Sequence, residues 1–541
     1  MLFRSHADHG RHFDGSLTVG SADRYDAVAD FRLSGPHAYL RGSATHAEVG
    51  DYRDGGGERV HGAYQRWSTL AGIGWTPDAD SLVEISTARS DGKAAYADRA
   101  MDGAKFAREN LGLKIEKKNP SPLVTALQAQ VYTNYVDHVM DNYSLRPFVA
   151  SPMMPAPAVS NPDRRTNGGR FALTLDPVTS FETVLGVDAQ DNRHTLRSTM
   201  NETTMPYEAM SRTQDAQFRQ RSLFGEFTQA LGEAARFVGG LRADRWHAED
   251  HRARLKLGVA SVANPTYGAT RDETLASGFL RYERDLGSQG SGIYAGLGRS
   301  ERFPDYWELI SASKEGPTAD DPSAFLTTHP EKTTQLDVGA TWKGAASSAY
   351  VSAFVARIDD YILIESNVAR GTGGMRRTVS IVRNVDASTH GAEAGLSHVF
   401  TPSLSGNANL AWVHGGNDTE HRPLAQQPPL EARFTLDWRH GDWSAGALLR
   451  AVAEQDRYAK NEGNIVGQDL GRTPGFAVFS LNAAWKPVPD LQLSAGIDNL
   501  FDRRYAEHLS RSGSMVEGYE QTTRVNEPGR TLWMKARVAF D

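Results

Sequence analysis

The sequence predicts an all-β protein, a large transmembrane antiparallel β-barrel of about 22 strands. Three observations predict this fold class: short segments of alternating polarity recur along the chain, short and long connections alternate between them, and the chain ends in one more such segment. In that last segment every second residue is apolar: Leu532, Met534, Ala536, Val538 and Phe540, with Thr531, Trp533, Lys535 and Arg537 between them. A strand with one apolar and one mostly polar face suits the closing strand of such a barrel.

The alternating segments are the expected strands, and they occur throughout the chain. Examples are residues 27–33, 39–45, 81–88, 171–175, 222–228, 349–356 and 432–438. They suit tilted strands of about 9–11 residues. At about 24 residues for each strand with its connection, the chain accommodates about 22 strands. This estimate is based on the size of large plugged transporters.

The connections between these segments are of two kinds. Residues 76–80 and 486–490 are short turns, whereas the long polar connections are residues 141–169, 196–217, 311–331 and 457–474. Alternation of the two kinds is typical of a barrel with tight periplasmic turns and long extracellular loops. A soluble repeat protein such as a propeller is the alternative, but the sequence contains no repeat of fixed period.

Composition excludes several other classes of protein. The 541 residues are too many for one ordinary soluble core, and no apolar run is long enough to cross a bilayer as a helix. The mean hydropathy of −0.49 still suits a barrel, whose strands keep half of their residues in a polar lumen. The absence of cysteine excludes a disulfide framework and a thiolate metal site. A net charge of −7 without a long basic block argues against nucleic acid as a partner.

The N-terminus has no recognisable secretory signal. Such a signal needs a basic start, an apolar core and a cleavage site with small residues, and residues 1–13 contain none of these. Since an exported barrel must have a signal, we expect the printed N-terminus to be incomplete.

Several motifs resemble those of a known family. Residues 491–502, 505–508 and 526–530 resemble the C-terminal signature of TonB-dependent outer-membrane receptors, and residues 302–309 and 330–339 resemble their mid-barrel pattern. This resemblance covers essentially the whole chain. A narrower resemblance, to the TonB-dependent copper receptors, rests on residues 129–146, 361–363, 384–387 and 428–434.

The resemblance implies a domain organisation and a set of partners. Residues 1–11 are interpreted as a remnant of the plug-to-barrel junction and residues 12–541 as the barrel, without the plug that family members carry before it. The implied location is the bacterial outer membrane, in contact with its lipid. The implied partners are the TonB–ExbB–ExbD complex, through the missing plug and TonB box, and the barrel assembly machinery, which would read Phe540. Without its plug, the chain is not expected to perform energised transport.

The alternation over residues 127–140 places two candidate metal ligands on one face. Odd-numbered positions from 127 to 135 are mostly lipid-compatible, whereas even-numbered positions are mostly polar and are expected to face the lumen. His138 and Met140 share this lumen face, about 6.5–7 Å apart along the strand. Because a long loop follows, we expect them at the extracellular mouth.

Imidazole and thioether together suit copper, because a thioether is soft and favours Cu(I) while imidazole accepts either oxidation state. In the copper receptors the ligands from the barrel are such a His-x-Met, and the resemblance assigns this role to His138 and Met140. The remaining ligands of the family, a Cys and a Met of the plug, are absent here. From spacing alone, His138 could instead be a hydrated lumen residue and Met140 a packing residue.

Methionines gather in the two predicted outer loops that follow. Six of the eleven lie between residues 140 and 210: Met140, Met153, Met154, Met200, Met205 and Met210, with His194 nearby. A mouth lined with methionine could capture Cu(I) weakly and pass it inward. Adaptable packing within the loops is the alternative interpretation.

The leading functional hypothesis is therefore copper uptake, with copper as the transported ligand and no catalytic cofactor. A receptor for a siderophore or another metal chelate, and a passive open pore, are the alternatives. No nucleophile elbow, P-loop or zinc-hydrolase motif is present, so an enzyme is not expected. Four further histidines are interpreted as surface or lumen residues, and two acidic residues as structural: His329, His390, His414 and His508, then Asp305 and Glu308.

Overall fold

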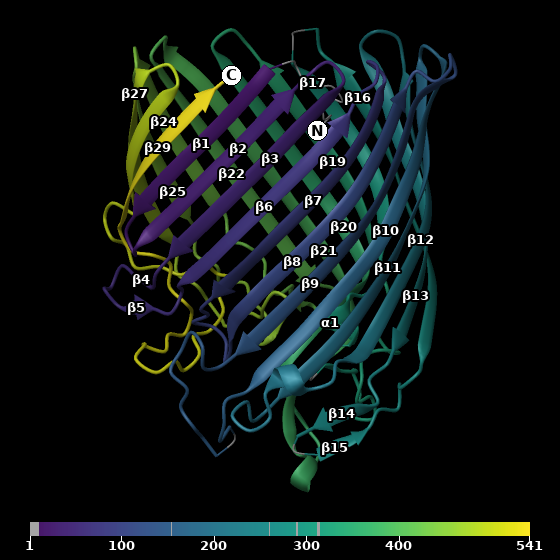
Figure 1. Ribbon diagram of the computed structural model, residues 1–541, viewed down its shortest axis with the longest axis vertical. Helices are drawn as coiled ribbons and strands as arrows, with labels where there is room; N and C mark the ends of the chain where they lie inside the picture. Colours follow the sequence, from purple (N-terminus) through teal and green to yellow (C-terminus); the bar gives the residue numbers. More distant parts are fainter. Residues whose placement is uncertain (1–9, 153, 259, 288–289, 311–313) are drawn as a thin grey trace.

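The computed structural model describes residues 10–152, 154–258, 260–287, 290–310 and 314–541. It is a closed antiparallel barrel of 22 strands, which confirms the predicted fold class and strand number (Figure 1). The first strand, β1 (Gly10–Gly20), pairs with the last, β29 (Thr531–Phe540), and Phe13 lies opposite Phe540. None of the helices within the described residues is long and apolar enough to cross a membrane.

The other barrel strands follow one another in chain order around the wall. They are β2 (Arg24–Ser34), β3 (Ala38–Val49), β6 (Tyr64–Trp75), β7 (Ser81–Ala94), β8 (Asp102–Lys118), β9 (Val124–Asp141), β10 (Val159–Val178), β11 (Phe181–Thr199), β12 (Thr213–Ala230), β13 (Ala235–Asp250), β16 (Thr270–Asp285), β17 (Gly292–Arg302), β19 (Glu331–Lys343), β20 (Ser347–Arg370), β21 (Arg377–Thr401), β22 (Leu404–Asn417), β24 (Glu431–His440), β25 (Trp443–Val452), β27 (Phe476–Val488) and β28 (Leu491–Asp498).

Short elements occur within the long connections. They are the strands β4 (Tyr52–Arg53), β5 (Arg59–Val60), β14 (Arg254–Leu257), β15 (Ala260–Ala263), β18 (Lys314–Glu315), β23 (Arg422–Pro423) and β26 (Glu462–Gly463), the α-helix α1 (Tyr306–Leu309), and the 3₁₀ helices η1 (Tyr207–Ala209) and η2 (Gly373–Met375).

The two ends of the barrel differ as predicted. Short turns lie at the end where the chain begins and finishes, and the long connections with β4, β5, β14, β15 and α1 lie at the other end (Figure 1). Residues 499–530 form a further long connection. One predicted connection was wrong, because residues 159–169 belong to β10 rather than to a loop. The start of β10 is polar on both faces, so it lacks the alternation that marks a strand lying in lipid.

Side chains alternate between lipid and lumen along the wall. Leu223 and Leu241 point outward and are 63% and 76% exposed. On the opposite face, the Arg242 guanidinium donates to Asp188 at 2.8 and 3.0 Å and to Asp244 at 2.9 and 3.0 Å. Charged groups are thus paired inside, and apolar groups cover the outside, as a membrane barrel requires.

The connection after β17 packs as a small core of its own against the barrel wall. Leu309, Ile310 and Phe325 are buried there with other apolar side chains. Asp305 begins α1 with a capping box: its carboxylate accepts from the Trp307 amide at 2.5 Å, and Glu308 accepts from the Asp305 amide at 2.7 Å. This agrees with the structural role expected for Asp305 and Glu308.

The start of β1 and the end of β29 lie side by side at the short-turn end of the barrel (Figure 1). Strand β1 starts at Gly10 rather than at the expected His12, and residues 1–9 lie outside the described residues. The assignment of residues 1–11 to a plug junction therefore stays a prediction. The exposed Phe540 ring stacks on Phe13 at 5.2 Å between centroids, across the closing seam.

Candidate metal site at the mouth of the barrel

The structure places His138 and Met140 near the loop end of β9, on its lumen face. The same face carries Tyr132 and Asn134, which bond to Gln190 at 3.4 Å and to Asn110 at 3.1 Å. Val131, on the opposite face, is an exposed apolar residue of the outer surface. The period of two therefore predicted the face correctly.

An aromatic ring fixes the orientation of His138. Phe106 of β8 lies directly opposite His138, and the two rings stack with centroids 4.5 Å apart and an interplanar angle of 28°. The Phe106 ring also covers Gly103, where a Cβ would come within 2.1 Å of the ring. Gly103 in turn lies opposite Met140, so one ring and one glycine shape the space around both candidate ligands. Among the described residues, the buried His138 Nε2 has no hydrogen-bond partner.

A buried polar cluster fixes the backbone at His138. The fully buried Asn161 of β10 donates its Nδ2 to the His138 carbonyl at 3.0 Å and to Asp137 at 2.7 Å. Its Oδ1 accepts from Arg197 and Arg212, each at 2.7 Å. Because these bonds hold the end of β9 in place, the backbone at His138 is rigid.

The next connection, residues 142–158, folds back toward β9. Asn142, the second residue after Met140, accepts from the Ala158 amide at 2.9 Å and donates its Nδ2 to the Met154 sulfur at 2.7 Å. Met154 therefore lies beside a residue two positions beyond the candidate pair. Burial raises the pKa of the neighbouring Tyr143 to about 12, so its phenol stays neutral.

The remaining predicted loop methionines are less closely placed. Met200, Met205 and Met210 are exposed in the connection 200–212, and no described contact joins them to Met140. A backbone bond from the Glu202 amide to Pro157 at 2.8 Å joins their loop to that of Met154. Met153 lies outside the described residues.

His194 belongs to a different environment from the one its position beside the loop methionines suggested. Its ring is buried, stacks on Tyr306 with centroids 4.1 Å apart, and meets Phe218 edge-on. His194 is thus part of the aromatic packing under α1.

The arrangement offers one buried imidazole nitrogen and one thioether sulfur on the same face of β9, near its loop end. Within the described residues, no group of three or more His, Cys, Asp or Glu could hold a metal ion. A two-ligand set of this kind, with one soft donor, suits Cu(I) better than a hard cation.

Comparison with known proteins places the chain in a family. The family model described as TonB dependent receptor-like, beta-barrel, matches residues 44–500. This chain is a TonB-dependent receptor barrel. The family and the closed barrel of 22 strands give its location, the outer membrane of a bacterium.

The receptor is similar to several proteins of known structure or curated function. It superposes on the copper transporter OprC with a TM-score of 0.93 at 43% identity, covering 99% of this chain and 83% of that one. The FrpB iron transporter of Neisseria meningitidis, at 15% identity and a TM-score of 0.72, shares the fold. The pesticin receptor of Yersinia enterocolitica is 24% identical over 396 residues, 68% of this chain and 50% of that protein. The receptor barrel thus spans about half the length of the curated relatives it matches.

Buried ionic contacts join the long connections of the receptor around its mouth. Asp102, fully buried at the start of β8, accepts from Arg146 at 2.8 and 2.5 Å and lies 3.0 Å from His61 Nε2. Arg146 also donates to the Tyr96 and Arg99 carbonyls at 2.9 and 2.8 Å. Three connections and a strand end therefore meet at one carboxylate, which sequence spacing did not reveal.

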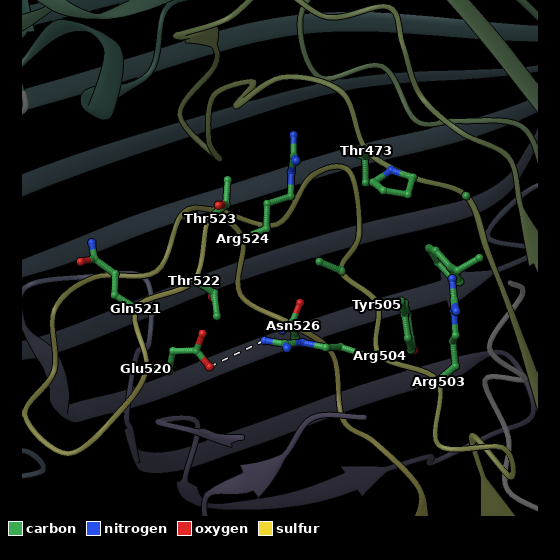
Figure 2. Close-up of a pocket in the computed structure, with 14 residues that line it drawn as sticks. Thr473, Arg503, Arg504, Tyr505, Glu520, Gln521, Thr522, Thr523, Arg524 and Asn526 are labelled. Atoms are coloured by element: carbon green, nitrogen blue, oxygen red, sulfur yellow. Dashed lines mark ion pairs between the residues drawn. The ribbon is translucent and has the colours of Figure 1, made fainter. Parts of the chain in front are cut away.

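A pocket of about 470 Å³ lies elsewhere in the loop assembly, between residues 473–476 and 503–526 (Figure 2). Arg504 reaches toward Glu520 across it, at 3.7 Å. Burial lowers the pKa of Arg524, whose guanidinium donates to the Arg472 and Gly471 carbonyls. The residues that line it include no His or Met.

Proposed function

We propose that the receptor barrel serves in copper uptake and binds copper at its extracellular mouth through His138 Nε2 and the Met140 thioether. One observation carries the proposal: a buried imidazole nitrogen without a hydrogen-bond partner shares the lumen face with a thioether two positions along β9. Buried polar atoms in proteins are nearly always paired, so a free one at a mouth is suited to an incoming ligand. The similarity to the copper transporter OprC supports the same ligand.

The loop methionines are proposed to capture Cu(I) weakly before it reaches this pair. Met154 supports the idea most strongly, because its sulfur lies against Asn142 beside the site. Met153, Met200, Met205 and Met210 are assigned the same role. Exposed thioethers have little packing to contribute in polar loops.

The proposal also assigns partners to the receptor, on the basis of its family. Transport would be coupled to the TonB–ExbB–ExbD complex through a plug and a TonB box, and residues 1–11 would be the remnant of the plug junction. Phe540 would be read by the barrel assembly machinery, and the outer face would contact lipid. No enzymatic activity and no catalytic cofactor are assigned.

A titration with three ligands distinguishes the possible substrates. Purified receptor in detergent is titrated anaerobically with Cu(I), and separately with Cu(II) and ferric enterobactin. We expect Cu(I) to bind tightest, because the thioether is a soft ligand. Binding of ferric enterobactin in preference to copper would instead support a receptor for a metal chelate. Large conductance in planar bilayers with no binding of any ligand would support a passive pore.

A further inference from the structure

Arginines face one another in pairs across neighbouring strands of the receptor. Arg165 of β10 lies directly opposite Arg193 of β11, and Arg221 of β12 lies directly opposite Arg245 of β13. Like charges in such positions repel and destabilise the sheet. Two such pairs within four consecutive strands point to a negative charge supplied from outside the protein.

Both pairs lie on the outer surface of the barrel. Arg221 shares its face of β12 with the exposed Leu223, and Arg245 shares its face of β13 with the exposed Leu241. The residues between them point the other way: Ser222 and Asp244 bond to Arg242 inside the lumen. On β10 and β11, the exposed Phe171 and Val187 mark the same outer face.

The arginines begin where the apolar surface ends. Phe171, Val187, Leu223 and Ala243 form one apolar row across the four strands. From that row toward the long connections, the next outward positions of β12 and β13 are Arg221 and Arg245. Arg165 and Arg193 lie on the same side of that row, further along β10 and β11 toward the long connections. Charged side chains that adjoin the apolar outer surface of a membrane barrel on its loop side suit the region of the lipid headgroups.

The carboxylates nearby do not neutralise this surface. Arg193 lies 3.2 Å from Asp191 but remains 57% exposed, and Arg245 lies 3.8 Å from Asp272 and remains 73% exposed. Arg219, between the two pairs, lies 3.1 Å from Glu249 and 3.6 Å from Asp191 and remains 45% exposed. Among the described residues, neither Arg165 nor Arg221 has a carboxylate within ion-pair distance, and the Arg165 guanidinium stacks on the Tyr135 ring at 5.1 Å.

We infer that these five arginines, the arginine belt, bind the phosphate groups of an outer-leaflet lipid. The belt consists of Arg165, Arg193, Arg219, Arg221 and Arg245. Guanidinium groups bind phosphate through paired, charge-assisted hydrogen bonds, and one phosphate between two facing arginines removes their repulsion. The acyl chains of the same lipid would lie on the apolar row beside the belt. A lipid rather than a soluble anion is the ligand, because the charges adjoin that row on the membrane-facing surface.

The test uses the full chain in detergent, titrated with diphosphoryl lipid A, with lipid A from which both phosphates have been removed, and with inorganic phosphate. Retained lipid is counted by native mass spectrometry, and the thermal midpoint is recorded at each concentration. Wild-type protein is expected to retain diphosphoryl lipid A and to melt at a higher temperature with it. The variant R165Q/R193Q/R221Q/R245Q is expected to bind it at least tenfold more weakly.

A control variant and the thermal midpoint measured without lipid provide two further tests. The variant R357Q removes an outer arginine of β20 that is paired with Asp359 at 2.9 Å, and it should bind lipid as wild type does. Without lipid, the fourfold variant should melt no lower than wild type, because it loses two repulsive pairs. Equal binding by the fourfold variant, or equal binding of lipid A without phosphates, would overturn the inference. The same midpoint shift from inorganic phosphate alone would overturn the assignment to a lipid.

Discussion

Replacing His138 and Met140 together by alanine is expected to weaken Cu(I) binding by more than about 100-fold, because changes in the outer shell of a metal site alone cost about 10–100-fold. The pair supplies both proposed donors from the barrel, and the described residues offer no cluster of three acidic, His or Cys ligands instead. Competition with a coloured Cu(I) chelator under anaerobic conditions measures the change.

Two further variants sharpen this prediction. Met140→Leu keeps the volume and removes the sulfur, so it should weaken Cu(I) more than Cu(II). The matched control is H440A/M534A, a His and a Met in other strands, which should bind copper as wild type does. Unchanged Cu(I) affinity in H138A/M140A would refute the assignment of the site.

Replacing Asp102 by asparagine is expected to destabilise the loop assembly at the mouth by about 3–5 kcal/mol, as removal of one partner of a buried ion pair does elsewhere. The change keeps the shape of the side chain but leaves the Arg146 guanidinium buried without its counter-charge. His61, at 3.0 Å, loses the same carboxylate. Limited proteolysis of residues 142–158 should therefore become much faster, while the transmembrane wall stays folded.

The control for this second prediction is Asp320→Asn, an exposed carboxylate in another long connection. It should leave the proteolysis rate unchanged. If Asp102→Asn were cleaved no faster than Asp320→Asn, the cluster around Asp102 would not hold the loops together.

The wall of the barrel was largely predictable from the sequence, because lipid on one side and water on the other impose a period of two. This is why the lumen face of His138 and Met140 followed from β9 alone. Beyond the lipid the constraint disappears, so the sequence pattern of the first residues of β10 predicts a loop rather than a strand. Their polar residues, such as Asn161 and Asp163, bond within the protein and carry no alternation.

Contacts between strands could not be predicted, since they depend on register. The spacing of His390 and His414 in the sequence does not predict a contact, yet they lie directly opposite one another with ring centroids 4.9 Å apart. The sequence likewise does not predict that the arginines of the belt face one another. Nor does it predict the contacts among His61, Asp102 and Arg146. The contact of Met154 with Asn142 likewise depends on how its loop folds back.

X-ray absorption at the copper edge of the Cu(I)-loaded receptor tests the central claim most directly, because it identifies the atoms bound to the metal. The account predicts a first shell with imidazole nitrogen and thioether sulfur, and loss of the Met140 sulfur contribution in Met140→Leu. A first shell of nitrogen and oxygen alone in the wild-type receptor, or a sulfur contribution unchanged in Met140→Leu, would contradict it.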